Sequence, residues 1–397
     1  MKIAILSDSK ENAGGSFHVT ASAFEFFRSV KFDDIKCDFI VTQQLVYEKL
    51  KDKYPSNLKF LNENNLRFKL SSYLYRNFLF KTLYHRFKIK NYFENFINKN
   101  KYDLIFFITP SNLLLLSNKI NFIYTIWEFA HKKYPSLPEY DENTISNRDR
   151  LYNYACNHAF KIVLFNEKSK NDFINYYLLD RSKIETLFFA PKLSNNKVEI
   201  FLEIEKKIKN KKYIFYPAQF WPHKNHSYLL ESLFEYNKKN IEKIYLVFTG
   251  RNKGNRDFIK SKISNLKMNN EVLIFEYLSE AEICYLYENC FSVAFPSFVG
   301  SQSLPLFESF LFNKPIMYND KIIDPIYKDA SLQLNIDDKN SLKLNIDKIL
   351  NDPIFILKML DSGKKIYKES LETNVIKNKL SSLFEEYKKY KDLGVTK

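Results

Sequence analysis

The amino-acid sequence predicts an α/β protein with two parallel β-sheets, and three observations support this fold class. Short apolar runs alternate with helical patterns of about ten residues, an order that is typical of parallel sheets. This alternation runs through the chain twice. At 397 residues, the chain is also longer than one ordinary core and suits two domains of roughly 150–200 residues each.

The composition excludes several other classes of protein. With 45% hydrophobic and 17% aromatic residues, the chain has far more core-forming material than disordered proteins have. Seven glycines and 12 prolines exclude collagen-like sequences. The four cysteines lie far apart and show no paired short spacing, which argues against a zinc site or a disulfide framework and favours a reducing compartment. They are Cys37, Cys156, Cys284 and Cys290.

The first series of elements begins at the N-terminus. Residues 2–6 form a short apolar run that ends at Ser7-Asp8, which is typical of a buried parallel strand. Two glycines and a helical pattern over residues 18–30 complete the first strand–loop–helix unit. Further strands are expected at residues 37–42, 103–108, 122–126 and 162–165, and further helices at residues 45–53 and 168–179.

The second series follows an amphipathic stretch at residues 198–209. Strands are expected at residues 213–216, 244–248, 272–275, 292–295 and 315–318, and helices at residues 227–237, 256–266, 280–289 and 304–312. We therefore expect two Rossmann-like lobes, over residues 1–192 and 193–365. Apolar residues spaced three to four apart predict one helix over residues 366–390, and the segment 366–397 is expected to pack back toward the N-terminal lobe.

Charge and hydropathy limit the partners and the location. The net charge is +15, which suits nucleic acid, an anionic membrane surface or phosphorylated small molecules. No apolar run reaches the roughly 18–20 residues that span a bilayer, and the N-terminal apolar stretch is too short for a signal peptide. We expect a cytoplasmic protein.

The clearest candidate segment is PAQFWPHKNH, residues 217–226, between a predicted strand and a predicted helix. Lys224, Asn225 and the following helix N-terminus bring a cation and free backbone N–H groups to one place. A helix N-terminus and a point charge together suit a diphosphate. The alternative interpretation is that Lys224 is a solvated loop lysine.

A second candidate segment is FPSFVGSQSLPLFESF, residues 295–310. A small-residue loop is followed by Leu304-Pro305, where proline suits the first turn of a helix. Glu308 lies one turn into that helix and is expected to accept two ribose hydroxyls. The alternative is an ordinary surface glutamate.

These segments, with VFTGRNKGN from Val247, resemble glycosyltransferase family 4, which contains retaining enzymes. The resemblance implies the GT-B fold, in which two Rossmann-like lobes face a central cleft, and a C-terminal helix is expected to end the chain. The resemblance covers most of residues 213–330. It implies that Lys224 holds the leaving diphosphate and that Glu308 holds the ribose. The other donor-binding positions that it implies are Gln219, His223, Asn225, Gly250, Arg251, Gly300, Ser301, Ser303 and Leu304.

Two positions depart from the family pattern. Many relatives carry a first glutamate, which contacts the transferred sugar, where this chain has Gly300. The base usually found five residues before the lysine is Gln219 here. Either sugar recognition differs here, or the loop makes the sugar contact through backbone groups and Ser301 or Ser303. The missing charge is expected to slow transfer unless Arg251, Lys253 or Arg256 replaces it.

The N-terminal lobe resembles the acceptor half of the family more weakly. Gly14 and Gly15 lie where the family has a glycine loop that approaches the donor phosphate; the alternative is that they only turn the chain. The segment YTIWEFAHKKYPSLPE, from Tyr124, resembles the family's acidic and histidine positions. We expect catalytic roles for Glu128 and His131, against the alternative that both are structural.

Residues 67–101 interleave aromatic and basic residues, with nine Lys or Arg and one acid, Glu94. Such a stretch suits the headgroup layer of an anionic membrane. The expected surface residues are Arg76, Lys81, Arg86, Lys88 and Lys90. The alternative is a pair of helices with aromatic core faces and solvated basic faces.

Together these features predict a hexosyltransferase-type glycosyltransferase. It would move a sugar from a nucleotide-diphosphate donor to a hydroxyl of a glycan or lipid-linked acceptor, with retention, in the synthesis of capsule, lipooligosaccharide or O-antigen. No metal or other cofactor is expected, since Lys224 and the helix dipole neutralise the leaving group. No nucleic acid is expected either, because about half of the excess positive charge is dispersed over residues 191–397. The alternatives are a sugar-nucleotide epimerase and a basic, non-catalytic scaffold on the same fold.

Overall fold

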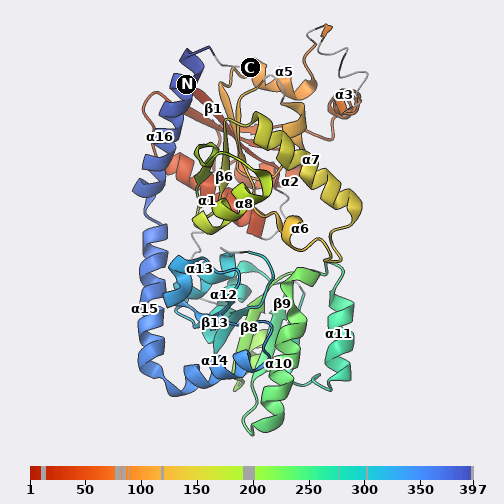
Figure 1. The fold of residues 1–397 in the computed structure, drawn as a ribbon, viewed down its shortest axis with the longest axis vertical. Helices are drawn as coiled ribbons and strands as arrows, with labels where there is room; N and C mark the ends of the chain where they lie inside the picture. The colour runs from red at the N-terminus through yellow and green to blue at the C-terminus, as the bar shows by residue number, and fades with distance from the viewer. Residues whose placement is uncertain are drawn as a thin grey trace. The chain divides into compact units, whose positions relative to one another are not determined.

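The computed structural model describes residues 1–9, 15–76, 82, 86–87, 89–117, 120–190, 202–276, 278–300 and 303–394. The chain divides into two units (Figure 1). The first unit contains Met1–Lys132, Glu142–Pro191 and Glu372–Lys397. The second unit contains Lys133–Asp141 and Lys192–Leu371. Each unit is built on one parallel sheet, so the predicted α/β class with two Rossmann-like lobes is confirmed.

Among the described residues, the sheet of the first unit has seven strands in the order β3-β2-β1-β4-β5-β6-β7, all parallel. Its strands are β1 (Lys2–Ser7), β2 (Lys36–Val41), β3 (Leu58–Phe60), β4 (Leu104–Phe107), β5 (Phe122–Thr125), β6 (Lys161–Leu164) and β7 (Ile184–Thr186). Its helices are α1 (Gly15–Ser29), α2 (Gln44–Leu50), α3 (Leu66–Arg76), α5 (Tyr92–Lys99), η1 (Asn112–Leu116), α6 (Ala130–Lys133), α7 (Glu142–His158), α8 (Glu167–Tyr177), η2 (Arg181–Lys183) and α16 (Thr373–Asp392).

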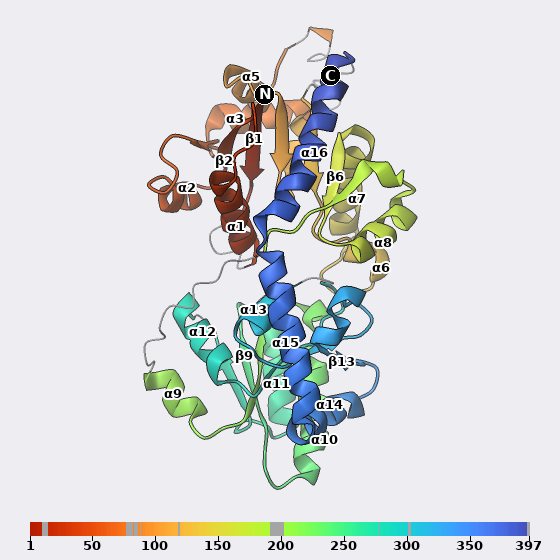
Figure 2. The same cartoon turned by 90° about the vertical axis from the view of Figure 1, so that its left-hand side faces the viewer.

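The strands of this sheet are apolar on both faces, and the side chains alternate between two cores. Ile3 and Ile5 of β1 pack into one cluster, and Ala4 and Leu6 pack into the other. The first cluster is covered by α1 and by the chain's last helix, α16, which buries Leu380, Leu383, Phe384 and Tyr387. Figure 2 shows α16 in blue along this unit.

In the described part of the second unit, the sheet has six strands in the order β10-β9-β8-β11-β12-β13, again all parallel. Its strands are β8 (Tyr213–Pro217), β9 (Tyr245–Thr249), β10 (Val272–Phe275), β11 (Ser292–Phe295), β12 (Ile316–Asn319) and β13 (Leu332–Leu334). Its helices are α9 (Leu202–Ile208), η3 (Pro222–Lys224), α10 (His226–Lys239), α11 (Arg256–Asn265), α12 (Glu280–Asn289), α13 (Leu304–Leu311), η4 (Pro325–Ala330), α14 (Asn340–Asn351) and α15 (Pro353–Ser370).

The single helix predicted over residues 366–390 is wrong. The structure has two helices, α15 and α16, which are interrupted at Leu371 and Glu372. The apolar spacing continues through the break because each helix buries its own face. Gly363 of α15 packs on Phe310 of the second unit, whereas Leu380 of α16 is buried in the first unit.

Candidate functional site

Two turns of the second unit follow neighbouring strands at the middle of its sheet. The segment after β8 contains residues 218–225, and the segment after β11 contains residues 296–303. The strand order reverses direction between β8 and β11, since β9 and β10 lie on one side and β12 and β13 on the other. In open α/β sheets, ligands bind beyond the carboxyl ends of the strands at this point.

The turn after β8 places Lys224 directly before a helix. Pro222, His223 and Lys224 form a short 3-10 turn, and Asn225 then takes a left-handed conformation, with φ at 53°. Asparagine tolerates this conformation better than most residues. The hydroxyl of Tyr216 in β8 donates to the carbonyl of Lys224 at 2.8 Å and so stabilises this turn. The helix α10 begins at the next residue, His226.

The two turns are joined to each other by hydrogen bonds. The carbonyl of His223 accepts from the backbone N–H of Phe298 at 2.9 Å and from the hydroxyl of Ser297 at 3.2 Å. The side-chain amide of Asn225 donates to the carbonyl of Pro296 at 3.4 Å. The amino end of α10 therefore lies next to the turn after β11, as an anion-binding site shared by both turns requires. We call the turn after β11 the second turn.

Lys224 and the second turn meet around one aromatic ring. The Lys224 ammonium lies 5.0 Å from the centre of the Phe295 ring, and Phe295 stacks on Tyr318. The Tyr318 hydroxyl bonds the carbonyl of Gly300 and the hydroxyl of Ser303. Lys224, Gly300 and Ser303 are thus brought together, whereas Ser301 lies outside the described residues.

The backbone explains why glycine stands at position 300. Its φ is 106°, a conformation that residues with a side chain rarely adopt. A Cβ atom built there would lie 3.4 Å from the Phe295 ring, which is an ordinary contact, so the positive φ is what favours glycine. A glutamate at this position would need a different turn.

Glu308 lies on α13, which begins at Leu304 with Pro305 in its first turn. Its carboxyl accepts a hydrogen bond from the hydroxyl of Tyr287 at 2.5 Å. Burial raises the pKa of Glu308 to about 7, although the bond from Tyr287 acts in the opposite direction. Its charge therefore changes near neutral pH.

Gly250 allows the turn after β9 to contact the turn after β8. A Cβ atom built on Gly250 would lie 2.5 Å from the carbonyl oxygen of Ala218, and its φ is 147°. The two turns are joined where the N–H of Phe220 donates to the carbonyl of Arg251 at 3.0 Å. The side-chain oxygen of Gln219 accepts from the indole of Trp221 at 3.2 Å.

The candidate replacements for the missing base differ in their surroundings. Arg256 forms an ion pair with Glu276 at 2.6 Å. The Lys253 ammonium lies over the ring of Trp221, 5.6 Å from its centre. Arg251 is half-buried and directly follows Gly250. Its carbonyl accepts from the N–H of Phe220, so its backbone contacts the turn that contains Gln219.

Residues 197–368 match the family model described as glycosyl transferases group 1. This group 1 region contains both turns, Lys224 and Glu308. No curated protein matches the chain significantly in sequence.

Solved structures resemble the chain over nearly its whole length. Anabaena Alr3699/HepE in complex with UDP and glucose matches with a TM-score of 0.70 and 13% identity, over 97% of this chain and 100% of that one. A glycosyltransferase from Rickettsia africae matches with a TM-score of 0.66 and 16% identity, over 97% and 98%. S. aureus TarM in complex with Fondaparinux, alpha-GlcNAc-glycerol and UDP matches with a TM-score of 0.67 and 14% identity, over 96% and 99%. At these identities the likeness shows the fold, which is GT-B.

Outside the group 1 region, the first unit places the predicted catalytic residues in a polar network. Glu128 pairs with Arg148, and its second oxygen accepts from the N–H of Ala130 at 2.7 Å. His131 is buried, and its Nε2 lies 3.0 Å from Asp149. Burial lowers the pKa of His131. Their catalytic roles stay a prediction, and the network supports a positioning role at least as well.

The predicted glycine loop is described only in part. Gly14 lies outside the described residues, and Gly15 is the first residue of α1. The acid that precedes this loop, Asp8, was not singled out from the sequence. Its two oxygens accept from Thr42 at 2.5 Å and from Ser111 at 2.8 Å, so it joins the carboxyl ends of β1, β2 and β4. The only signal was Ser7-Asp8, which we interpreted as the end of a strand.

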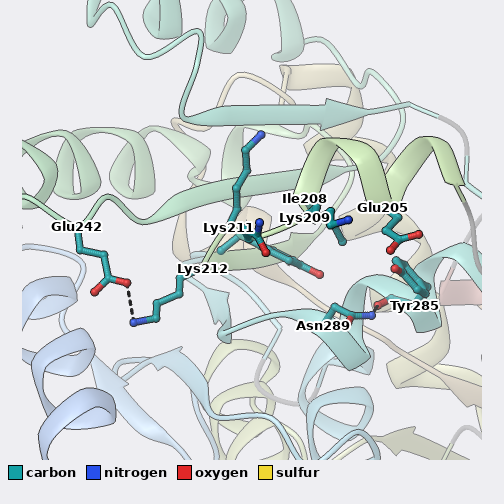
Figure 3. A pocket seen from close by; sticks show the side chains of 10 residues that line it. Glu205, Ile208, Lys209, Lys211, Lys212, Glu242, Tyr285 and Asn289 are labelled. Carbon is teal, nitrogen blue, oxygen red and sulfur yellow. Dashed lines mark hydrogen bonds and ion pairs between the residues drawn. The ribbon is translucent and has the colours of Figure 1, made fainter.

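A pocket of about 480 Å³ lies elsewhere in the second unit (Figure 3). It is lined by Tyr213 at the amino end of β8, together with Glu205 of α9 and Tyr285 of α12. Lys212 and Glu242 also line this pocket and form an ion pair at 2.8 Å (Figure 3). Because the two turns follow the carboxyl ends of the strands, this pocket is separate from the candidate site.

Metal binding and membrane spanning find no support in the part of the chain that the structure describes. There, no group of three or more His, Cys, Asp or Glu residues is arranged to hold a metal ion. None of the described helices has the length and apolar character needed to cross a bilayer.

Proposed function

We propose that this protein is a retaining glycosyltransferase of the hexosyltransferase type that uses a nucleotide-diphosphate sugar. The observation that carries the proposal is the junction of the two turns, which gathers Lys224, the amino end of α10, Gly300 and Ser303 around Phe295. The group 1 match over residues 197–368 supports it, because the matched region contains this whole junction. UDP is the first nucleotide to test, since structures of Alr3699/HepE and TarM contain it.

In this proposal the second unit stabilises the leaving diphosphate. Negative charge grows on the β-phosphate as the bond to the sugar breaks. The Lys224 ammonium and the backbone N–H groups at the start of α10 stabilise that charge, and they are already in place before the reaction. Glu308 accepts hydroxyls of the ribose. Because these groups supply the positive potential, the proposed reaction needs no metal ion.

The stereochemistry and the acceptor follow from the family resemblance. We propose that the acceptor hydroxyl attacks from the side that the phosphate leaves, and that the phosphate takes its proton. The first unit would bind a glycan or lipid-linked acceptor in the synthesis of a surface polysaccharide. Glu128 or His131 would orient that acceptor.

Nucleotide binding is the direct test. Thermal unfolding is measured with UDP, GDP and CDP, each at the same concentration and without added metal. One nucleotide, expected to be UDP, should raise the unfolding temperature because a ligand that binds only the folded state stabilises it. The absence of a shift with all three would favour the non-catalytic scaffold. Mass spectrometry after incubation with the sugar donor separates transfer from epimerisation, since an epimer keeps the donor's mass.

We also propose that the protein binds the cytoplasmic face of an anionic membrane through α3 in the first unit. Leu66, Leu70 and Tyr73 lie on one face of this helix and are 79%, 57% and 71% exposed. The opposite face is buried through Phe68 and Tyr75. Apolar side chains on an exposed face suit insertion at the boundary between headgroups and acyl chains.

Basic residues accompany this exposed face. Arg67 and Lys69 are exposed on the same helix, and Arg86 and Lys90 are exposed beyond it. Of the other predicted surface residues, Lys81 and Lys88 lie outside the described residues, as does the side chain of Arg76. Each base near an anionic surface contributes about 1 kcal/mol.

A triple substitution tests the membrane surface. The Leu66→Ser, Leu70→Ser, Tyr73→Ser variant should lose at least about tenfold in co-sedimentation with vesicles that contain phosphatidylglycerol, because it removes the inserting side chains. The matched control is Leu344→Ser, Ile354→Ser, Leu357→Ser, which changes three exposed apolar residues of the second unit. Equal loss in both variants, or concentration-dependent dimers that the first variant abolishes, would contradict a membrane role for α3.

A further inference from the structure

A short segment between α6 and α7 belongs to the second unit, although its neighbours on both sides belong to the first. This segment is Lys133–Asp141. Near its end, Glu139 reaches the turn that carries Lys224. One oxygen of Glu139 accepts two hydrogen bonds from the same residue, His223: one from its ring Nδ1 at 2.5 Å and one from its backbone N–H at 3.3 Å.

This contact is shielded from water. The side chains of Glu139 and His223 are 6% and 15% exposed. The second oxygen of Glu139 is buried and has no hydrogen-bond partner among the described residues. Burying a carboxylate in this way is unfavourable, and such groups are often retained where they serve a function.

His223 connects three parts of the second unit. Its ring and N–H bond Glu139, whereas its carbonyl bonds Ser297 and Phe298 of the second turn. The segment Lys133–Asp141 contacts the second turn as well, because the ring of Tyr134 packs against that of Phe298, with 5.8 Å between their centres. Both turns of the proposed donor site therefore contact this segment, the first through His223 and the second through Phe298.

The hydrogen bond also determines the state of the imidazole ring. A carboxylate only accepts, so Nδ1 of His223 must carry a proton. The ring of Trp221 lies beside it, nearly parallel, with 6.1 Å between the ring centres. Both the orientation and the tautomer of His223 are thus set by residues around it.

We infer that Glu139 is a positioning residue for nucleotide binding: it fixes the ring of His223 and so holds the turn that carries Lys224 against the turn after β11. This inference rests on the proposed function. Glu139 acts through His223 and the backbone of residues 222–225 rather than by touching the reacting atoms.

The experiment compares four forms of the full chain: the wild type, Glu139→Ala, Glu139→Gln and the control Glu142→Ala. Glu142 is exposed at the start of α7, so its substitution makes the same change in charge. UDP affinity is measured by calorimetry. The tautomer of His223 is read from ¹⁵N NMR spectra, with its signals assigned by their loss in His223→Gln.

Glu139→Ala should raise the Kd for UDP about tenfold, because the turn that carries Lys224 must then be ordered when UDP binds. It should also move the His223 proton away from Nδ1. Glu139→Gln keeps an accepting oxygen and should retain the Nδ1–H form and most of the affinity. Glu142→Ala should match the wild type in both measurements.

Unchanged UDP affinity in Glu139→Ala, or an unchanged His223 tautomer, would overturn the inference. A merely structural role would lower the unfolding temperature and move the His223 proton, but it would leave the UDP affinity unchanged. If Glu139→Ala does not fold, Glu139→Asp replaces it, and its shorter side chain should shift the tautomer and weaken UDP in the same direction. If the wild type itself binds no nucleoside diphosphate, the proposed function fails; if the wild type binds and the variants bind equally well, only the role of Glu139 fails.

Discussion

Two charged residues of the second unit show how surroundings determine what a side chain can do. Lys224 lies over the Phe295 ring at the junction of the two turns, where its charge can meet an anion. Glu308 is half-buried beside Tyr287, and desolvation raises the pKa of its carboxyl to about 7. Lys224 supplies a positive charge, and Glu308 supplies a negative charge that depends on pH.

Replacing Lys224 should remove the main electrostatic contribution to diphosphate binding. Lys224→Ala is expected to weaken UDP by about 1.5–3 kcal/mol, or roughly 10- to 100-fold, and to abolish sugar transfer while the fold is retained. Calorimetry and circular dichroism measure the two effects. Lys239→Ala, at the exposed C-terminal end of α10, is the control. Equal UDP affinity in the two variants would exclude Lys224 from the site.

Glu308 predicts a pH dependence of donor binding. An ionised carboxylate accepts hydrogen bonds from both ribose hydroxyls, whereas a protonated one loses part of this capacity. With a pKa of about 7, Glu308 is mostly protonated at pH 6, so the Kd for UDP-glucose should fall up to about tenfold between pH 6 and pH 8. UDP-glucose is the better probe than UDP because its diphosphate does not titrate in this range. A Glu308→Gln variant with the same pH profile as the wild type would contradict this assignment.

The raised pKa of Glu308 also makes the stability of the folded protein depend on pH. The folded protein holds the Glu308 proton more tightly than the unfolded chain, where the pKa is about 4.5. The contribution of Glu308 to stability is therefore present below pH 4.5 and is lost as the pH rises to 7. Urea unfolding of the wild type and Glu308→Gln at pH 5 and pH 8 measures it.

At the scale of elements, the site depends on how closely three turns approach one another. The turns after β8 and β11 share hydrogen bonds at His223, and the turn after β9 packs on Ala218 through Gly250. Because strands β9, β8 and β11 are neighbours, their carboxyl ends bring these turns together.

Gly250→Ala should disturb this packing. A Cβ atom there would clash with the Ala218 carbonyl and would also occupy a conformation that favours glycine. The second unit should lose roughly 2–5 kcal/mol of unfolding free energy through strain and overpacking, and UDP affinity should fall. Gly254→Ala is the matched control, since its φ is 95° but no atom lies within 4 Å of its Cβ position. If both variants lose the same unfolding free energy, the contact between Gly250 and Ala218 adds no cost beyond that of the positive φ.

At the scale of the molecule, the chain passes from one unit to the other more than once. Lys133–Asp141 leaves the first unit to join the second, and the C-terminal segment from Glu372 returns to the first. Neither unit is a continuous piece of sequence. The stability of the first unit should therefore depend on the last residues of the chain.

Ending the chain at Leu371 tests this dependence. The truncation removes Leu380, Leu383, Phe384 and Tyr387, all buried in the first unit. At about 1.5–3 kcal/mol for each buried side chain, the loss is comparable to the whole stability of a domain. Calorimetry should show that the first unit no longer unfolds cooperatively, whereas UDP still raises the unfolding temperature of the second unit. An unchanged transition of the first unit would show that α16 contributes little.

Much of this architecture was predictable because the signals are local. The apolar runs and the glycines and prolines between them place nearly all strands of the second unit to within a residue or two. Three strands, β3, β7 and β13, were missed because each has only three residues. Because the strands are parallel, the turns after β8 and β11 lie at the same edge of one sheet. The order of elements along the chain is therefore enough to assign Lys224 and Glu308 to the same unit.

The amino-acid sequence by itself thus determined the α/β class, the positions of most strands and the two turns of the candidate site, since each depends on neighbouring residues. Only the tertiary structure decided which distant side chains meet. Glu139 and His223 are 84 residues apart, and Tyr287 and Glu308 are 21 residues apart. Hydrogen bonds between such residues leave no periodic pattern in the sequence, because they depend on how the units fold and not on the spacing along one helix or strand.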